Sequence, residues 1–152
     1  VEVVNEFQTA EQFTPPQLIA RKDTPMGQAI LQGLELLNQR KALYREHGIP
    51  FFRPWVFLIT DGSPTDDWRA AAAEVLKGEE SRAFAFFAVG VEGANLDILQ
   101  RISTRQPLRL KGLRFRELFQ WLSNSMRSVS RSAPGTEVPL SNPAAPDGWA
   151  AV

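Results

Sequence analysis

Residues 55–60 form the apolar run Trp-Val-Phe-Leu-Ile-Thr, which follows Pro54 and ends at Asp61 and Gly62. A short apolar run bounded by turn-forming residues, and rich in aromatic and β-branched side chains, is typical of a strand buried on both faces. Such strands occur in parallel sheets whose faces are covered by helices. The run therefore predicts a central parallel strand within an α/β domain.

A long helix is predicted upstream of this strand. Thr24 has the character of an N-cap, and Pro25 suits the first helical position. Apolar residues follow at helical spacing until about His47, and Gly48 is expected in the left-handed conformation that ends many helices. The apolar residues with this spacing are Met26, Ile30, Leu34 and Leu37.

Three more helices are predicted downstream of the strand. The first begins with Asp66 as its N-cap, is closed by Lys77 and Gly78, and has its inward positions at Trp68, Ala71, Ala72, Val75 and Leu76. The next is short and begins at Asn95. The last carries an amphipathic stripe. The stripe consists of Phe115, Leu118, Phe119, Leu122, Met126 and Val129.

Strands are predicted at residues 83–91 and 107–110, and the β-branched run at residues 1–4 predicts an edge strand. Strands and helices thus alternate along the chain. This alternation predicts a Rossmann-like α/β fold with a mostly parallel central sheet flanked by helices.

With 152 residues, of which 43% are hydrophobic, the chain is expected to form one domain. We place this domain at residues 1–131. Residues 132–152 are rich in proline and lack an apolar period, so we expect a disordered tail in which Trp149 is incidental.

The charge totals cancel, because seventeen basic residues face seventeen acidic ones. Residues 61–97 are mainly acidic and residues 101–131 mainly basic, which we interpret as solvated helix faces and not as a nucleic-acid surface. The chain contains no cysteine, which excludes disulfides and thiolate metal sites and fits the cytoplasm. No apolar run is long enough for a membrane helix, so no membrane association is expected.

Two loops carry candidate ligands for a metal ion. Thr24 places a hydroxyl at the start of the long helix, and Asp61 places a carboxylate directly after the central strand. Ligand sites in open parallel sheets lie beyond the carboxyl ends of the strands, and hydroxyl and carboxylate oxygens suit Mg²⁺ or Mn²⁺. A simple N-cap at Thr24 and a simple turn at Asp61 explain the same residues about equally well.

The strings Thr-Pro-Met-Gly at residues 24–27, Asp-Gly-Ser-Pro-Thr-Asp-Asp-Trp at 61–68 and Phe-Phe-Ala-Val-Gly-Val at 86–91 resemble von Willebrand factor A (vWA) domains. Within that family the chain is most similar to the bacterial TerY-like group associated with tellurium resistance. The resemblance covers the chain to about residue 130. It implies a metal-ion-dependent adhesion site (MIDAS) in which Thr24 and Asp61 are the threonine and aspartate ligands.

The third MIDAS element of the family, an Asp-x-Ser-x-Ser loop after the first strand, occurs nowhere in this sequence. The resemblance therefore implies that the first strand, the first helix and the second strand of the domain are lacking. We expect this N-terminal part to be a missing partner of the chain, with its first strand pairing beside residues 55–60. Mg²⁺ or Mn²⁺ binding is expected only if the missing loop is supplied.

The resulting hypothesis is a metal-dependent protein-binding module and not an enzyme. Ser63, Asp66 and Asp67 are the predicted partner-binding residues around the metal. The resemblance suggests a protein kinase or a protein phosphatase as the partner, in a stress-response type of signalling assembly. One alternative is a Mg²⁺-dependent phosphoryl-transfer or hydrolytic enzyme that uses Asp61. A second alternative is a metal-free interaction scaffold.

Overall fold

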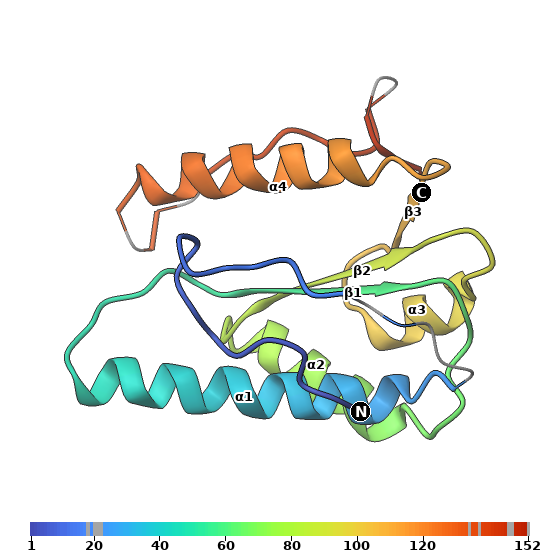
Figure 1. Ribbon diagram of the computed structural model, residues 1–152, viewed down its shortest axis with the longest axis horizontal. Helices are drawn as coiled ribbons and strands as arrows, with labels where there is room; N and C mark the ends of the chain where they lie inside the picture. Colours follow the sequence, from blue (N-terminus) through green and yellow to red (C-terminus); the bar gives the residue numbers. More distant parts are fainter. Residues whose placement is uncertain (18, 20–22, 134, 137, 146–147, 152) are drawn as a thin grey trace.

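The computed structural model describes residues 1–17, 19, 23–133, 135–136, 138–145 and 148–151. Helices and strands alternate along most of the chain (Figure 1). The helices are α1 (Met26–Glu46), α2 (Arg69–Glu80), α3 (Leu96–Ile102) and α4 (Phe115–Ser130). The strands are β1 (Trp55–Thr60), β2 (Ala85–Gly90), β3 (Leu108–Leu110) and β4 (Ala150–Ala151). None of these helices combines the length and apolar content that a membrane-spanning segment needs.

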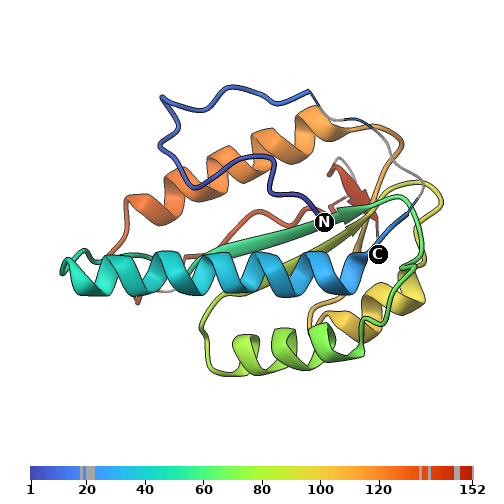
Figure 2. The same cartoon turned by 60° about the horizontal axis from the view of Figure 1, so that its bottom comes forward.

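The strands form one sheet in the order β1-β2-β3-β4. β1 pairs with β2 in parallel, from Trp55 opposite Ala85 to Thr60 opposite Gly90, and β2 also pairs with β3 in parallel. β4 pairs with β3 in antiparallel orientation. Helices α1, α2 and α3 lie on one side of the sheet and α4 on the other (Figures 1 and 2). The predicted α/β class and the mostly parallel sheet flanked by helices are confirmed.

The strand predicted to be central lies at an edge. Among the described residues, β1 has one strand neighbour, β2. Ile59, near its end, is 38% exposed. The predicted edge strand at residues 1–4 is wrong, because these residues have an irregular backbone and pair with no strand of the sheet. A β-branched run forms a strand only when a partner satisfies its amide and carbonyl groups.

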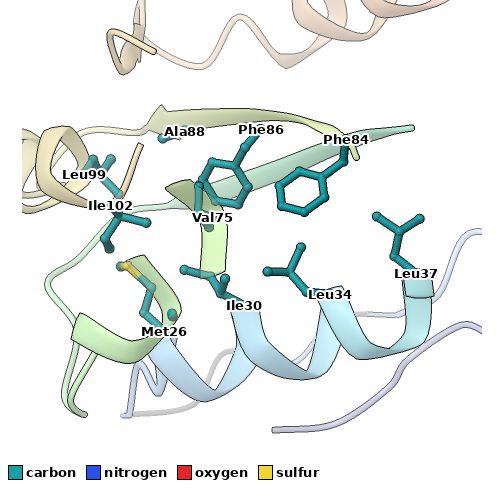
Figure 3. Close-up of a cluster of buried hydrophobic side chains, with 11 residues drawn as sticks. Met26, Ile30, Leu34, Leu37, Val75, Phe84, Phe86, Ala88, Leu99 and Ile102 are labelled. Atoms are coloured by element: carbon teal, nitrogen blue, oxygen red, sulfur yellow. The ribbon is translucent and has the colours of Figure 1, made fainter. Parts of the chain in front are cut away.

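The main core lies between the sheet and helices α1 to α3 (Figure 3). The predicted apolar face of α1 is confirmed, since Met26, Ile30, Leu34 and Leu37 are all buried. They point toward Phe84, just before β2, toward Phe86 within it, and toward the neighbouring side chains of α2 and α3. In α3, Asn95 is the predicted N-cap, and its side chain accepts a hydrogen bond from the Ile98 amide at 3.1 Å.

Two details of α2 differ from prediction. Leu76 is exposed, so the inward stripe is narrower than expected and centres on Ala71 and Val75. Gly78 does not end the helix, which continues to Glu80. Gly78 is buried against the ring of Phe84, which occupies the space that a Cβ at this position would need. The glycine therefore serves packing, and the turn that ends α2 lies further along the chain.

The face of the sheet beneath α4 is aromatic. Phe57 and Phe87 stack with ring centroids 4.8 Å apart, and Trp55 stacks on Trp121 of α4 at 6.3 Å. The predicted α4 stripe is only partly right. Phe119 and Met126 are exposed, whereas Trp121, which lies outside that stripe, is buried. The Trp121 indole contacts the rings of Trp55 in β1 and Phe87 in β2.

The expectation that Trp149 is incidental is wrong. Trp149 is only 3% exposed and contacts Trp121 edge-on, with centroids 5.8 Å apart. The Trp121 indole N–H donates to the Ser141 carbonyl at 2.8 Å, and Ala150 begins strand β4. The described residues between 138 and 151 therefore pack against α4 and β3, in contrast to the disordered tail expected for residues 132–152. A single large aromatic side chain supplies the burial that the proline-rich composition did not suggest.

Candidate functional site

Three loops meet at the end of the sheet where β1 and β2 finish. They are residues 23–25 before α1, residues 61–67 after β1, and residues 91–94 after β2. The Thr24 carbonyl accepts a hydrogen bond from the Thr65 amide at 2.9 Å, and the Thr24 amide donates to Thr65 Oγ1 at 3.1 Å. A Cβ on Gly93 would stand 2.8 Å from the Asp61 carbonyl oxygen. The loop after β1 is therefore held between the other two.

The Thr24 hydroxyl is not the cap of α1, contrary to prediction. The N-cap residue is Pro25, and no side chain of that residue type can close the first turn. Thr24 Oγ1 instead lies 3.7 Å from the position that a Cβ on Gly62 would take. Within the described part of the chain it makes no hydrogen bond. The hydroxyl is thus free for another partner at the loop that carries Asp61.

Asp61 is exposed at the same rim. Its backbone is fixed on both sides, by the close approach of Gly93 and by the hydrogen bond from the Gly62 amide to Thr60 Oγ1 at 3.3 Å. Its carboxylate pairs with no cation among the residues that the structure describes. The structure therefore brings Thr24 and Asp61, predicted to be metal ligands, to one end of the sheet. Neither the Thr24 hydroxyl nor the Asp61 carboxylate has a hydrogen-bond or ion-pair partner among the described residues.

Asp66 has a different structural role from the predicted cap of the second helix. Its Oδ1 accepts a hydrogen bond from the Gly27 amide at 3.0 Å, and its Oδ2 accepts one from the Gln28 amide at 2.8 Å. These amides belong to the first turn of α1, which has no intrahelical acceptor for them. The Asp66 carboxylate therefore caps α1 across a separation of 38 residues. A negative charge at this end also complements the helix dipole.

Asp67 makes a local turn just before α2, whose N-cap residue, Trp68, makes no side-chain capping hydrogen bond. Its Oδ1 accepts from the Arg69 amide at 3.0 Å and from the Arg69 guanidinium at 3.1 Å. These hydrogen bonds, from the Arg69 backbone first and its side chain second, lower the pKa of Asp67. Ser63 is exposed on the same loop. The partner-binding role of Ser63, Asp66 and Asp67 stays a prediction, although both Asp66 oxygens already have donors.

The loop that carries these residues is pressed against α1. A Cβ on Gly27 would overlap the Asp67 carbonyl oxygen, so only glycine allows the helix to begin here. Together with the two hydrogen bonds of Asp66, this contact fixes the first turn of α1 relative to residues 61–67. The position of Thr24, two residues before the helix, follows from that contact.

The rim offers part of a coordination shell for a hard cation. Among the described residues there is no group of three or more histidine, cysteine, aspartate or glutamate side chains placed to hold a metal. One threonine hydroxyl and one carboxylate fit the ligand preference of Mg²⁺ or Mn²⁺, which keeps waters in its shell. The residues present therefore suit such an ion, provided that further oxygens complete the shell.

Comparison with known families bears on the same loops. The model of the von Willebrand factor type A domain matches residues 10–116, which include α1, β1, α2, β2, α3 and β3. The chain belongs to the von Willebrand factor type A domain family. vWA domains are generally protein-interaction or metal-binding modules. Neither a comparison with curated proteins nor one with solved structures found a match.

Sequence reasoning missed two features of this vWA rim. Thr65 holds Thr24 through both its amide and its hydroxyl, and Asp66 caps α1. Neither contact leaves a local signal, because each joins residues far apart in the chain. The run of aspartates after β1 did indicate helix-capping chemistry, but it did not indicate which helix Asp66 caps.

Proposed function

We propose that this vWA domain is a protein-binding module of the MIDAS type, and not an enzyme. In it, Thr24 and Asp61 contribute oxygen ligands to Mg²⁺ or Mn²⁺. The observation that carries the proposal is the placement of Thr24. Asp66, and not the Thr24 hydroxyl, caps α1, and the Thr24 hydroxyl faces Gly62, next to Asp61. A cation held there would supply a positive charge with an open position for a carboxylate of the partner.

The rest of the coordination shell is proposed to come from the Asp-x-Ser-x-Ser segment that vWA domains place after their first strand. The free edge of β1 supports this part of the proposal. Ile59 is exposed there, and among the described residues no strand satisfies the outer amide and carbonyl groups of β1. A strand added at this edge would end at the same rim as Asp61, because neighbouring parallel strands end together.

Ser63 and Asp67, exposed on the loop after β1, would frame the partner's carboxylate. We propose a kinase or phosphatase as that partner, in a cytoplasmic assembly like those of TerY-like tellurium-resistance proteins. This context rests on the resemblance of the Asp-Gly-Ser-Pro-Thr-Asp-Asp-Trp string at residues 61–68.

The test is a calorimetric titration of the protein with Mn²⁺, in the presence and in the absence of a peptide that contains an Asp-x-Ser-x-Ser loop. We expect the peptide to strengthen binding, and the variants Asp61→Ala and Thr24→Ala to weaken it about tenfold or more, as loss of a ligand contact does. Glu80→Ala is the matched control, because it removes an exposed negative charge from the far end of α2.

Two results would contradict the proposal. Equal Mn²⁺ affinity in the parent and in the Asp61 and Thr24 variants would favour a metal-free scaffold. Turnover of a phosphorylated substrate that Asp61→Asn abolishes would favour an enzyme instead.

A further inference from the structure

At the opposite end of the sheet from the rim, where β1 and β2 begin, three arginines border one cavity. The cavity has a volume of about 500 Å³, and Arg53, Arg82 and Arg105 line it together with Phe52, Trp55 and Phe87. Its size is within the range of small-molecule sites. The site combines positive charge with aromatic surface.

Two of the arginines are held in place by one buried carboxylate. The Glu79 side chain is 7% exposed; its Oε2 lies 2.7 Å from Arg53 Nη2, and its Oε1 lies 3.0 Å from Arg105 Nε. Arg105 also stacks over the ring of Phe87, with its Cζ 5.3 Å from the centroid. The single charge of Glu79 balances only one of these two guanidinium groups. The pair therefore keeps a net positive charge in a fixed geometry.

Arg82 adds a second unbalanced charge, and its backbone conformation is unusual. Its φ is 55°, in the left-handed region. The Arg82 amide donates to the Glu79 carbonyl at 3.0 Å, and the Ala83 amide donates to the Gly78 carbonyl at 2.8 Å. This is the Schellman pattern, whose left-handed position is normally glycine. Arginine at that position costs conformational energy that glycine would avoid.

Arg82 lines the cavity without forming an ion pair among the described residues. Within the described residues the Arg82 guanidinium has no carboxylate partner. Arginine at this left-handed position thus lowers local stability and places a positive charge at the same cavity as Arg53 and Arg105. Strain of this kind persists only where surrounding contacts hold the residue in place, and strained residues are concentrated at ligand and active sites.

We propose that this cavity binds a small organic anion in which a phosphate is attached to a flat aromatic body, such as a nucleoside monophosphate. The phosphate would receive charge-assisted hydrogen bonds from Arg82 and from the unpaired N–H groups of Arg53 and Arg105. The aromatic body would lie against Trp55 and Phe52, as bases stack on aromatic side chains. This inference is independent of the metal site at the rim.

The test is calorimetric titration of the protein with AMP in buffer without divalent cations. We expect the parent protein to bind AMP, and Arg82→Gly to weaken binding about tenfold, as loss of one charge-assisted hydrogen bond does. Arg101→Ala is the matched control, since it removes an exposed positive charge from α3, outside the cavity. Its affinity for AMP should equal that of the parent.

Thermal unfolding separates binding from folding. Because glycine suits the left-handed position, Arg82→Gly should keep or raise the Tm while it weakens AMP binding. If its Tm falls, Arg82→Asn provides the second variant, since asparagine also tolerates this conformation. The proposal is overturned if the parent does not bind AMP, if adenosine binds as tightly as AMP, or if the folded Arg82 variant binds like the parent.

Discussion

The carboxylate of Asp66 accepts the backbone amide of Gly27 at 3.0 Å, and so joins the loop after β1 to the start of α1. The second Asp66 oxygen accepts the Gln28 amide at 2.8 Å, so Asp66 provides two capping contacts to α1 from another segment of the chain. Asp66→Ala leaves those amides without acceptors. We expect it to lower the free energy of unfolding by about 1–2 kcal/mol.

Urea unfolding measures this effect, and Asp67→Ala is its control. Asp67 is also an aspartate of the same loop, but its contacts are exposed and reach only Arg69. Its loss should change stability by less than about 0.5 kcal/mol. Equal effects of the two variants would mean that Asp66 does not cap α1.

Trp149 tests whether the C-terminal residues are part of the folded core. Trp149→Ala should lower the free energy of unfolding by about 3–5 kcal/mol, because a buried aromatic side chain is lost. Trp149→Phe should cost much less, since the buried Trp149 indole N–H has no hydrogen-bond partner among the described residues. Chemical unfolding of both variants gives the comparison, and a neutral Trp149→Ala would show that the segment is not packed.

Two helical glycines should respond in opposite directions to alanine. Gly78 of α2 lies against the Phe84 ring, where an added methyl group has no space, so Gly78→Ala should destabilise by about 1–3 kcal/mol. Gly33 of α1 has nothing within 4 Å of its Cβ position. Gly33→Ala should therefore stabilise by about 0.5–1 kcal/mol through helix propensity alone. Parallel thermal unfolding of the pair checks both signs, and a neutral Gly78→Ala would contradict the packing.

Glu79 should make stability depend on pH in the acid range. Burial alone would raise its pKa, but hydrogen bonds from Arg105 and the Phe86 amide, and the charges of Arg105 and Arg53, hold the pKa below the ordinary value of 4.5. A carboxyl group with a lowered pKa in the folded state stabilises the protein above its unfolded value. That contribution is fully present above about pH 5 and is lost as the pH falls through the folded pKa.

Glu79→Gln removes this titration. The stability difference between the parent and Glu79→Gln should therefore be larger at pH 7 than at pH 3. Urea unfolding at the two pH values measures it, and a difference that does not change with pH would show that Glu79 does not titrate as described.

The elements of this fold were predictable where a local pattern determines them. Three of these patterns involve only residues that are close in the sequence. They are the apolar run of β1, the helical spacing from Met26 to Leu37 and the Asn95 cap. The errors concern contacts between distant segments. The burial of Trp149, the capping of α1 by Asp66 and the edge position of β1 depend on which parts of the chain meet, and no local period records that.

The candidate site follows the same division. Residue type and position after a strand identified Asp61 and Thr24, and the structure brings their loops together through Thr65. The hydroxyl of Thr24 could not be told from a helix cap by sequence, because the residue that caps α1 in its place lies beyond β1. Whether the two residues ligate a metal remains a prediction for the titration above.

The overlap that a side chain at Gly27 would create with Asp67 also limits how the rim can move. A displacement of residues 61–67 toward α1 must move the helix as well, because no gap separates the loop from Gly27. A helix of 21 residues is about 30 Å long, and a rigid shift of α1 along its axis would also move Tyr44, whose ring centroid lies 5.8 Å from that of Phe51. An isotope-labelled ring at Tyr44, the only tyrosine of the chain, would therefore report a shift of α1 that begins at the distant rim.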